Sequence, residues 1–114
     1  MERDSRAYLL DVRDNCDLIL SFVKDSDLKA YKANDLIKSA VERRFIILGE
    51  ALNRLKALDL NLLGQIPDAA RIVAFRNILV HGYESISDEL VWEIVVDHVP
   101  LLRAKCDELL AGVT

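Results

Sequence analysis

Apolar side chains recur every three or four residues along most of this chain, and this spacing predicts α-helices. Residues 5–24 carry one apolar stripe with charged side chains between its members, a pattern typical of an amphipathic helix that covers a core. Residues 35–59 carry apolar side chains on more than one face, so this longest helix needs neighbours on two sides, either other helices or a second subunit. A third helix is predicted over residues 67–81, and a fourth helical segment follows Ser87.

Caps and interruptions divide these segments. Asn34 and Ser87 stand at the starts of two helices, where a short polar side chain accepts a hydrogen bond from a free backbone N–H. Residues 25–29 break the pattern and are predicted to start a short helical turn that runs through Tyr31. Residues 61–64 are predicted to form a loop, and Pro67 suits the first turn of the third helix.

The predicted fold is one all-α domain over residues 1–114, an antiparallel bundle of four to five helices. No stretch alternates polar and apolar side chains with the period of a strand. Pro100 is expected to kink the last segment, or to split it into two helices, near Val99. Gly49 stands inside the longest helix, where glycine costs about 1 kcal/mol relative to alanine, so we expect another element to approach the backbone closely there.

The composition is that of a globular domain. Of 114 residues, 52% are hydrophobic and 30% are charged, which excludes a disordered chain. The formal net charge of −4 gives no general attraction to nucleic acid. Any contact with RNA would therefore depend on a local patch of positive charge.

Cysteines, histidines and the amino terminus bear on location and cofactors. Cys16 and Cys106 lie far apart without metal-ligand spacing and are expected to be reduced thiols in a cytosolic core. His98 is expected to be structural, and no constellation of ligands predicts a metal or cofactor.

The charged amino terminus lacks the apolar region of a signal peptide, and no uncharged apolar stretch approaches the roughly 18 residues of a membrane span. We therefore expect a cytoplasmic protein with no membrane segment.

Most of the plausible chemistry gathers in the stretch from Arg76 to Tyr83. Arginine presents a planar fork of donors that suits phosphate, and histidine is the side chain best suited to move a proton near neutral pH. Arg76 and His81 together therefore suit phosphodiester chemistry, with Asn77 one turn below the histidine. Gly82 is a natural residue for the left-handed position past a helix end, which would leave Tyr83 in a loop at the mouth of the site.

Spacing alone does not bring the two central groups together. Arg76 and His81 are five positions apart, which is about 140° around an ideal helix. They converge only if the arginine curls round the last turn or if a second copy of the chain brings its own pair alongside. On spacing alone, a histidine that caps the helix and an arginine that forms a surface ion pair remain the simpler interpretation.

Two carboxylates on the longest helix are candidate supporting residues. Glu42 and Glu50 fit a solvated face, with an ion pair such as Glu50 with Arg54. In the alternative, one of them orients Arg76 or His81 across the pair of helices.

This stretch, in its setting, resembles a known family. The motif resembles the signature of the HepT-like toxins of the HEPN superfamily, in which an arginine is followed after four residues by a histidine and after one more by a tyrosine. Here these residues are Arg76, His81 and Tyr83. Further blocks that resemble the family, in family order and at family spacing, are AVER at 40–43, ILGEA at 47–51, IP at 66–67 and VWEIV at 91–95. The resemblance spans nearly the whole chain and implies a dimeric helical bundle.

The resemblance implies a metal-independent endoribonuclease that works as a homodimer, with Arg and His of both protomers lining one composite cleft. Carried onto this sequence, it has Arg76 bind the scissile phosphate, His81 act as acid or base, and Asn77 position one of them. Attack by a 2′-hydroxyl to leave a cyclic phosphate needs only proton transfer and charge stabilisation. DNA lacks that nucleophile, so the substrate would be RNA.

The resemblance also implies a partner. HepT-like toxins are paired with a small MntA-like nucleotidyltransferase antitoxin that transfers AMP from ATP onto the motif tyrosine, which is Tyr83 here. Such AMPylation would place bulk and negative charge at the cleft mouth, where it would repel RNA and engage Arg76. This chain would then be the toxin component of a toxin–antitoxin pair.

Two alternatives stay open at this point. HEPN-like bundles also resemble the non-catalytic, substrate-binding subunits of two-component nucleotidyltransferases. The acidic net charge and the absence of a basic groove favour that hypothesis, whereas intact Arg76 and His81 favour the nuclease. A plain dimerisation module is the third possibility, in which Arg76 would matter only for stability.

Overall fold

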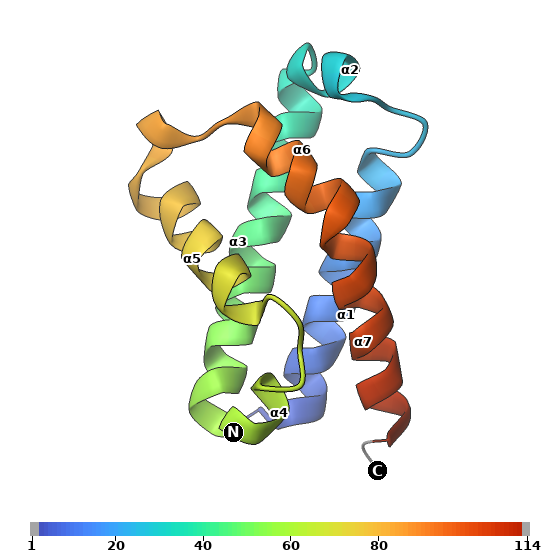
Figure 1. The fold of residues 1–114 in the computed structure, drawn as a ribbon, viewed down its shortest axis with the longest axis vertical. Helices are drawn as coiled ribbons and strands as arrows, with labels where there is room; N and C mark the ends of the chain where they lie inside the picture. The colour runs from blue at the N-terminus through green and yellow to red at the C-terminus, as the bar shows by residue number, and fades with distance from the viewer. Residues whose placement is uncertain (1–2, 113–114) are drawn as a thin grey trace.

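The computed structural model describes residues 3–112, and this part of the chain is helical with no strand (Figure 1). In order, the elements are α1 (Ser5–Phe22), α2 (Leu28–Lys32), α3 (Asp35–Leu58), α4 (Leu60–Leu63), α5 (Ala69–His81), the 3₁₀ turn η1 (Tyr83–Ser85), α6 (Asp88–Asp97) and α7 (Val99–Gly112). The all-α prediction is confirmed, with α2 as the predicted short helical turn and α4 as a short addition between the longer helices.

The longest helix, α3, is the centre of the bundle. In Figure 1, α5 lies along one side of α3, and α1 and α7 lie along the other. α6 crosses near the end where α2 sits and leads into α7. This arrangement explains why α3 is apolar on more than one face: it packs against both α1 and α5. On the α5 side, the rings of Phe45 and Phe75 meet edge to face with centroids 5.1 Å apart.

The predicted caps and the predicted break are confirmed. Asn34 Oδ1 accepts from the backbone N–H of Ile37 at 3.0 Å, and Ser87 Oγ accepts from that of Leu90 at 3.2 Å. α6 ends at Asp97 and α7 begins two residues later, beside Pro100 as the sequence predicts. These contacts supply partners for N–H groups that a helix start leaves free.

The predicted loop at residues 61–64 is wrong, because most of this stretch forms the short helix α4. Asp59 caps that helix by accepting from the N–H of Leu62 at 3.0 Å. Leu62 and Leu63 are buried under the bundle. The burial of these two leucines stabilises α4, which the polar and glycine residues around it do not predict.

The third helix begins two residues later than predicted. Pro67 lies outside α5, because Asp68 adopts a left-handed backbone conformation with φ 59°. The Asp68 carboxylate does not cap the helix but lies 2.6 Å from Nδ1 of His98. His98 thus ties the start of α5 to the junction between α6 and α7, which is the structural role expected of it.

Both cysteines are buried free thiols. Burial raises the pKa of Cys106 to about 12 and also raises that of Cys16, so both stay protonated and unreactive near neutral pH. Within residues 3–112, none of the helices combines the length and the apolar character needed to cross a lipid bilayer.

Candidate functional site

Gly49 sets the distance between α3 and the motif helix α5. A Cβ atom built at Gly49 would lie 2.4 Å from Cβ of Arg76 and 2.7 Å from its Cγ. Non-bonded carbon atoms prefer separations of about 3.5–4.0 Å, so only glycine fits. The predicted close approach at this position is confirmed, and the element that approaches is the arginine of the motif itself.

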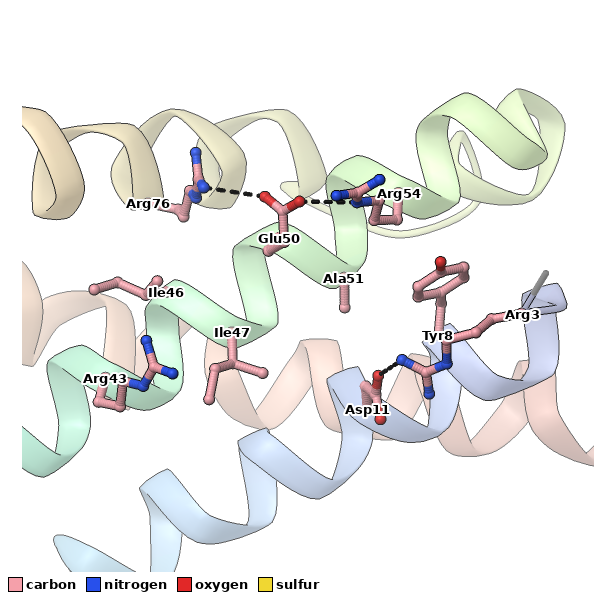
Figure 2. Close-up of a pocket in the computed structure, with 10 residues that line it drawn as sticks. All are labelled: Arg3, Tyr8, Asp11, Arg43, Ile46, Ile47, Glu50, Ala51, Arg54 and Arg76. Carbon is pink, nitrogen blue, oxygen red and sulfur yellow. Dashed lines mark hydrogen bonds and ion pairs between the residues drawn. The ribbon is translucent and has the colours of Figure 1, made fainter. Parts of the chain in front are cut away.

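Two neighbours hold the Arg76 guanidinium in place. Nη2 lies 3.0 Å from Oε2 of Glu50, and Nη1 donates to Oδ1 of Asn77 at 2.9 Å. The other carboxylate oxygen of Glu50 accepts from Nε of Arg54 at 2.9 Å, so Glu50 stands between two arginines (Figure 2). Because the Arg76 side chain is only 22% exposed, this packing fixes its direction more firmly than a surface ion pair would.

Of the two candidate carboxylates, the structure brings Glu50 to Arg76 and leaves Glu42 elsewhere. Glu42 is eight residues earlier on α3, about 12 Å along the helix axis. Burial and the nearby charge of Asp88 raise the pKa of Glu42, and Lys38 opposes that shift. Glu42 therefore belongs to the contact between α3 and the start of α6.

His81 is exposed at the last position of α5, and the Arg76 guanidinium is turned toward Glu50 instead of toward it. Gly82 follows with φ −122°, so the left-handed position expected there is not adopted. The N–H of Gly82 instead donates to the carbonyl of Ile78 at 2.8 Å, and the chain runs into η1. Tyr83 begins the 3₁₀ turn η1, where the sequence predicts a loop, and is 73% exposed.

A groove of about 440 Å³ adjoins Arg76, between α1, α3 and α5 (Figure 2). We call it the arginine groove. The residues that line it are Arg3, Tyr8, Asp11, Arg43, Ile46, Ile47, Glu50, Ala51, Arg54 and Arg76. Sequence reasoning missed this groove as a site, although positions 43, 47, 50 and 54 have the spacing of one helix face.

Among residues 3–112, His, Cys, Asp and Glu side chains form no group of three or more that could hold a metal ion. The polar groups that the structure gathers are instead guanidinium, amide and carboxylate groups around Arg76. The guanidinium of Arg76 can bind an anion and stabilise developing negative charge, while Glu50 and Asn77 hold it in place.

Comparison with known proteins identifies a family for the chain. Residues 12–109, which include every residue from Arg76 to Tyr83, match the family described as Ribonuclease HepT-like. "Putative RNase MJ1380" of Methanocaldococcus jannaschii is 31% identical over 108 residues, covering 93% of this chain and 96% of that protein. "Probable ribonuclease HepT" of Thermococcus cleftensis is 27% identical over 111 residues, covering 96% of this chain and 98% of that protein.

No solved structure gives a significant match to the chain. The family match covers well over half of the chain, and the similarity to the Methanocaldococcus jannaschii protein runs over nearly the full length of both sequences. The chain therefore belongs to the HepT-like ribonuclease family of the HEPN superfamily.

Proposed function

We propose that this chain is a metal-independent endoribonuclease whose active site contains Arg76, Asn77 and His81. The observation that carries the proposal is the held guanidinium: Glu50 and Asn77 fix Arg76 on the helix that ends at the exposed His81. Membership of the HepT-like ribonuclease family supports ribonuclease activity.

The proposed reaction uses the 2′-hydroxyl of the substrate as nucleophile. Its oxygen forms a bond to the adjacent phosphorus while the bond from phosphorus to the 5′-oxygen breaks, leaving a 2′,3′-cyclic phosphate and a 5′-hydroxyl. One histidine takes the proton from the nucleophile, and another group returns a proton to the leaving oxygen. Arg76 stabilises the negative charge that develops on the phosphate oxygens.

A homodimer supplies the groups that one copy lacks at the cleft. Within one chain, Arg76 is held by Glu50 and does not curl toward His81. The surface beside the motif also has unburied apolar side chains, since Ile78 and Val80 are 38% and 39% exposed. A second copy seated there would cover these side chains and bring its own arginine and histidine to a composite site.

The proposal predicts RNA cleavage that survives removal of divalent metal. With EDTA present, the purified chain should cut a single-stranded RNA oligonucleotide and leave cyclic phosphate ends, detected by mass spectrometry of the products. The matched control is the same oligonucleotide with one 2′-deoxynucleotide at the cut position, which should stay intact because its nucleophile is missing. Loss of cleavage in EDTA, or equal cleavage of the deoxy control, would refute the proposed reaction.

We further propose that the chain is the toxin of a pair whose MntA-like nucleotidyltransferase antitoxin adds AMP to Tyr83. The exposed position of the tyrosine supports this, because its hydroxyl can reach the active site of another enzyme. The phenolic oxygen would bond to the α-phosphorus of ATP, and pyrophosphate would leave. The added phosphate would bring negative charge close to the motif.

Replacing Tyr83 by phenylalanine should leave RNA cleavage within about twofold of wild type but make it resistant to the transferase and ATP. Intact-protein mass spectrometry and residual nuclease activity would measure both effects. Tyr31→Phe is the matched control, because Tyr31 is buried and its hydroxyl has no hydrogen-bond partner in the described part of the chain. Modification of the Tyr83→Phe chain to the wild-type extent would exclude Tyr83 as the acceptor.

The alternative of a non-catalytic substrate-binding subunit drew on the acidic net charge and the lack of an evident basic groove in the sequence. The arginine groove supplies a local positive surface beside Arg76. This favours the nuclease over the binding subunit.

A further inference from the structure

We propose that the arginine groove is a second phosphate-binding region, which holds the RNA strand next to the scissile phosphate through Arg43 and Arg54. The proposal takes RNA as the substrate and so rests on the proposed function. It assigns binding roles to residues outside the motif.

Charge balance is the first support. The chain has a formal net charge of −4, yet the groove contains four arginines and two carboxylates. Arg3 is paired with Asp11, while Arg54 and Arg76 share the single carboxylate of Glu50. The side chain of Arg43 has no ionic or hydrogen-bonding partner among residues 3–112. The groove therefore concentrates positive charge on an otherwise acidic molecule.

The positions of the arginines are the second support. Arg43 and Arg54 are eleven residues apart on α3, which is about 16 Å along the axis and only about 20° around it. They lie on either side of Glu50, where Arg76 reaches across from α5 (Figure 2). The separation between Arg43 and Arg54 exceeds the size of one phosphate group. The arginines of the groove can therefore bind successive phosphates of one RNA strand.

Accessibility is the third support. The Arg54 side chain is 65% exposed and Arg43 is also exposed, whereas Arg76 is 22% exposed. A guanidinium in water keeps free N–H donors that match phosphate oxygens. The Arg76 side chain is thus held in one orientation, whereas the exposed guanidinium groups of Arg43 and Arg54 remain available to a flexible RNA strand.

The chemistry predicts contacts with little dependence on base sequence. Arginines that bind phosphates hold the strand in register, while base edges carry sequence information. The groove floor between the arginines includes Ile46 and Ile47, which have no hydrogen-bond donors in their side chains with which to read bases. The groove should therefore raise the affinity for RNA and favour longer strands, with little effect on which base sequence is bound.

The test measures binding without requiring cleavage. The probe is a fluorescent, fully 2′-O-methylated single-stranded oligonucleotide of about twelve nucleotides, which has no free 2′-hydroxyl and so cannot be cut. Anisotropy titrations over a range of salt concentrations compare wild type with Arg43→Ala, Arg54→Ala and Arg43→Lys. Arg71→Ala is the matched control, because Arg71 lies on α5 outside the groove and pairs with Glu93 at 3.5 Å.

Loss of one phosphate contact should lower the slope of log affinity against log salt by about 0.7, which is about fivefold in affinity at 0.1 M salt. We expect this for Arg43→Ala and Arg54→Ala, near-wild-type binding for Arg43→Lys, and no change for Arg71→Ala. Unchanged binding of both groove variants would overturn the proposal. Dissociation of a dimer by Arg43→Ala, seen by size-exclusion chromatography, would also overturn it, because the groove would then be a subunit interface.

The cleavage assay separates this proposal from the proposed function. If wild type cuts RNA and the groove variants bind like wild type, the nuclease stands and the second phosphate-binding region fails. If wild type does not cut RNA but the groove variants lose affinity and salt dependence, the nuclease fails and the groove is still a strand-binding surface.

Discussion

Replacing His81 by alanine is expected to lower the rate of RNA cleavage by about 10²- to 10⁴-fold, the usual contribution of a positioned acid or base. The fold should survive, because His81 is exposed at the last position of α5 and its backbone N–H lies within the helix. Single-turnover rates with saturating enzyme measure the chemical step directly. A rate within threefold of wild type would assign the proton transfer to another group.

The other histidine gives a matched control. His98 lies 2.6 Å from Asp68 and joins the start of α5 to the junction of α6 and α7. His98→Ala should therefore melt at a lower temperature but, well below its melting temperature, cleave RNA at close to the wild-type rate. The opposite pattern, with normal cleavage in His81→Ala and none in His98→Ala, would assign the catalytic role to His98 instead of His81.

Replacing Gly49 by alanine is expected to reduce both stability and cleavage. The new methyl group would stand 2.4 Å from Cβ of Arg76, so α5 must shift away from α3. Overpacking of this kind costs about 1–3 kcal/mol, against which the better helix propensity of alanine restores about 1 kcal/mol. The displaced Arg76 would lose its contact with Glu50, and we expect at least tenfold slower cleavage.

Urea unfolding and single-turnover cleavage measure these two effects. Gly112→Ala is the control, because nothing lies within 4 Å of a Cβ atom built there, and it should neither lower the stability nor slow the cleavage. A Gly49→Ala chain that is as stable and as active as wild type would show that the contact between α3 and Arg76 is not needed.

Much of the fold follows from local signals in the sequence. Asn34 and Ser87 cap their helices through contacts with residues three positions on, so nearby sequence suffices to predict them. The short helix at Leu62 and Leu63 and the left-handed Asp68 depend instead on burial and on a distant histidine. No local pattern contains that information.

Some features of the site can likewise be predicted from the sequence, whereas others depend on how the helices pack. The motif and the glycine opposite it are visible in the sequence, but the choice between Glu42 and Glu50 depends on how far α5 slides along α3. The periodicity of either helix does not determine that offset, and the close contact at Gly49 does. The arginine groove escaped sequence reasoning because its residues come from three separate helices and the amino-terminal segment before α1.

If two copies of the chain share one catalytic cleft, dimers that combine two different inactive variants should recover RNA cleavage. Arg76→Ala and His81→Ala chains, each inactive alone, are unfolded together and refolded as a mixture, and RNA cleavage in EDTA is measured against each chain refolded separately. We expect the mixture to regain a substantial part of wild-type activity, because its heterodimers combine the arginine of one copy with the histidine of the other. A mixture that forms heterodimers yet stays as inactive as its components would contradict a shared cleft.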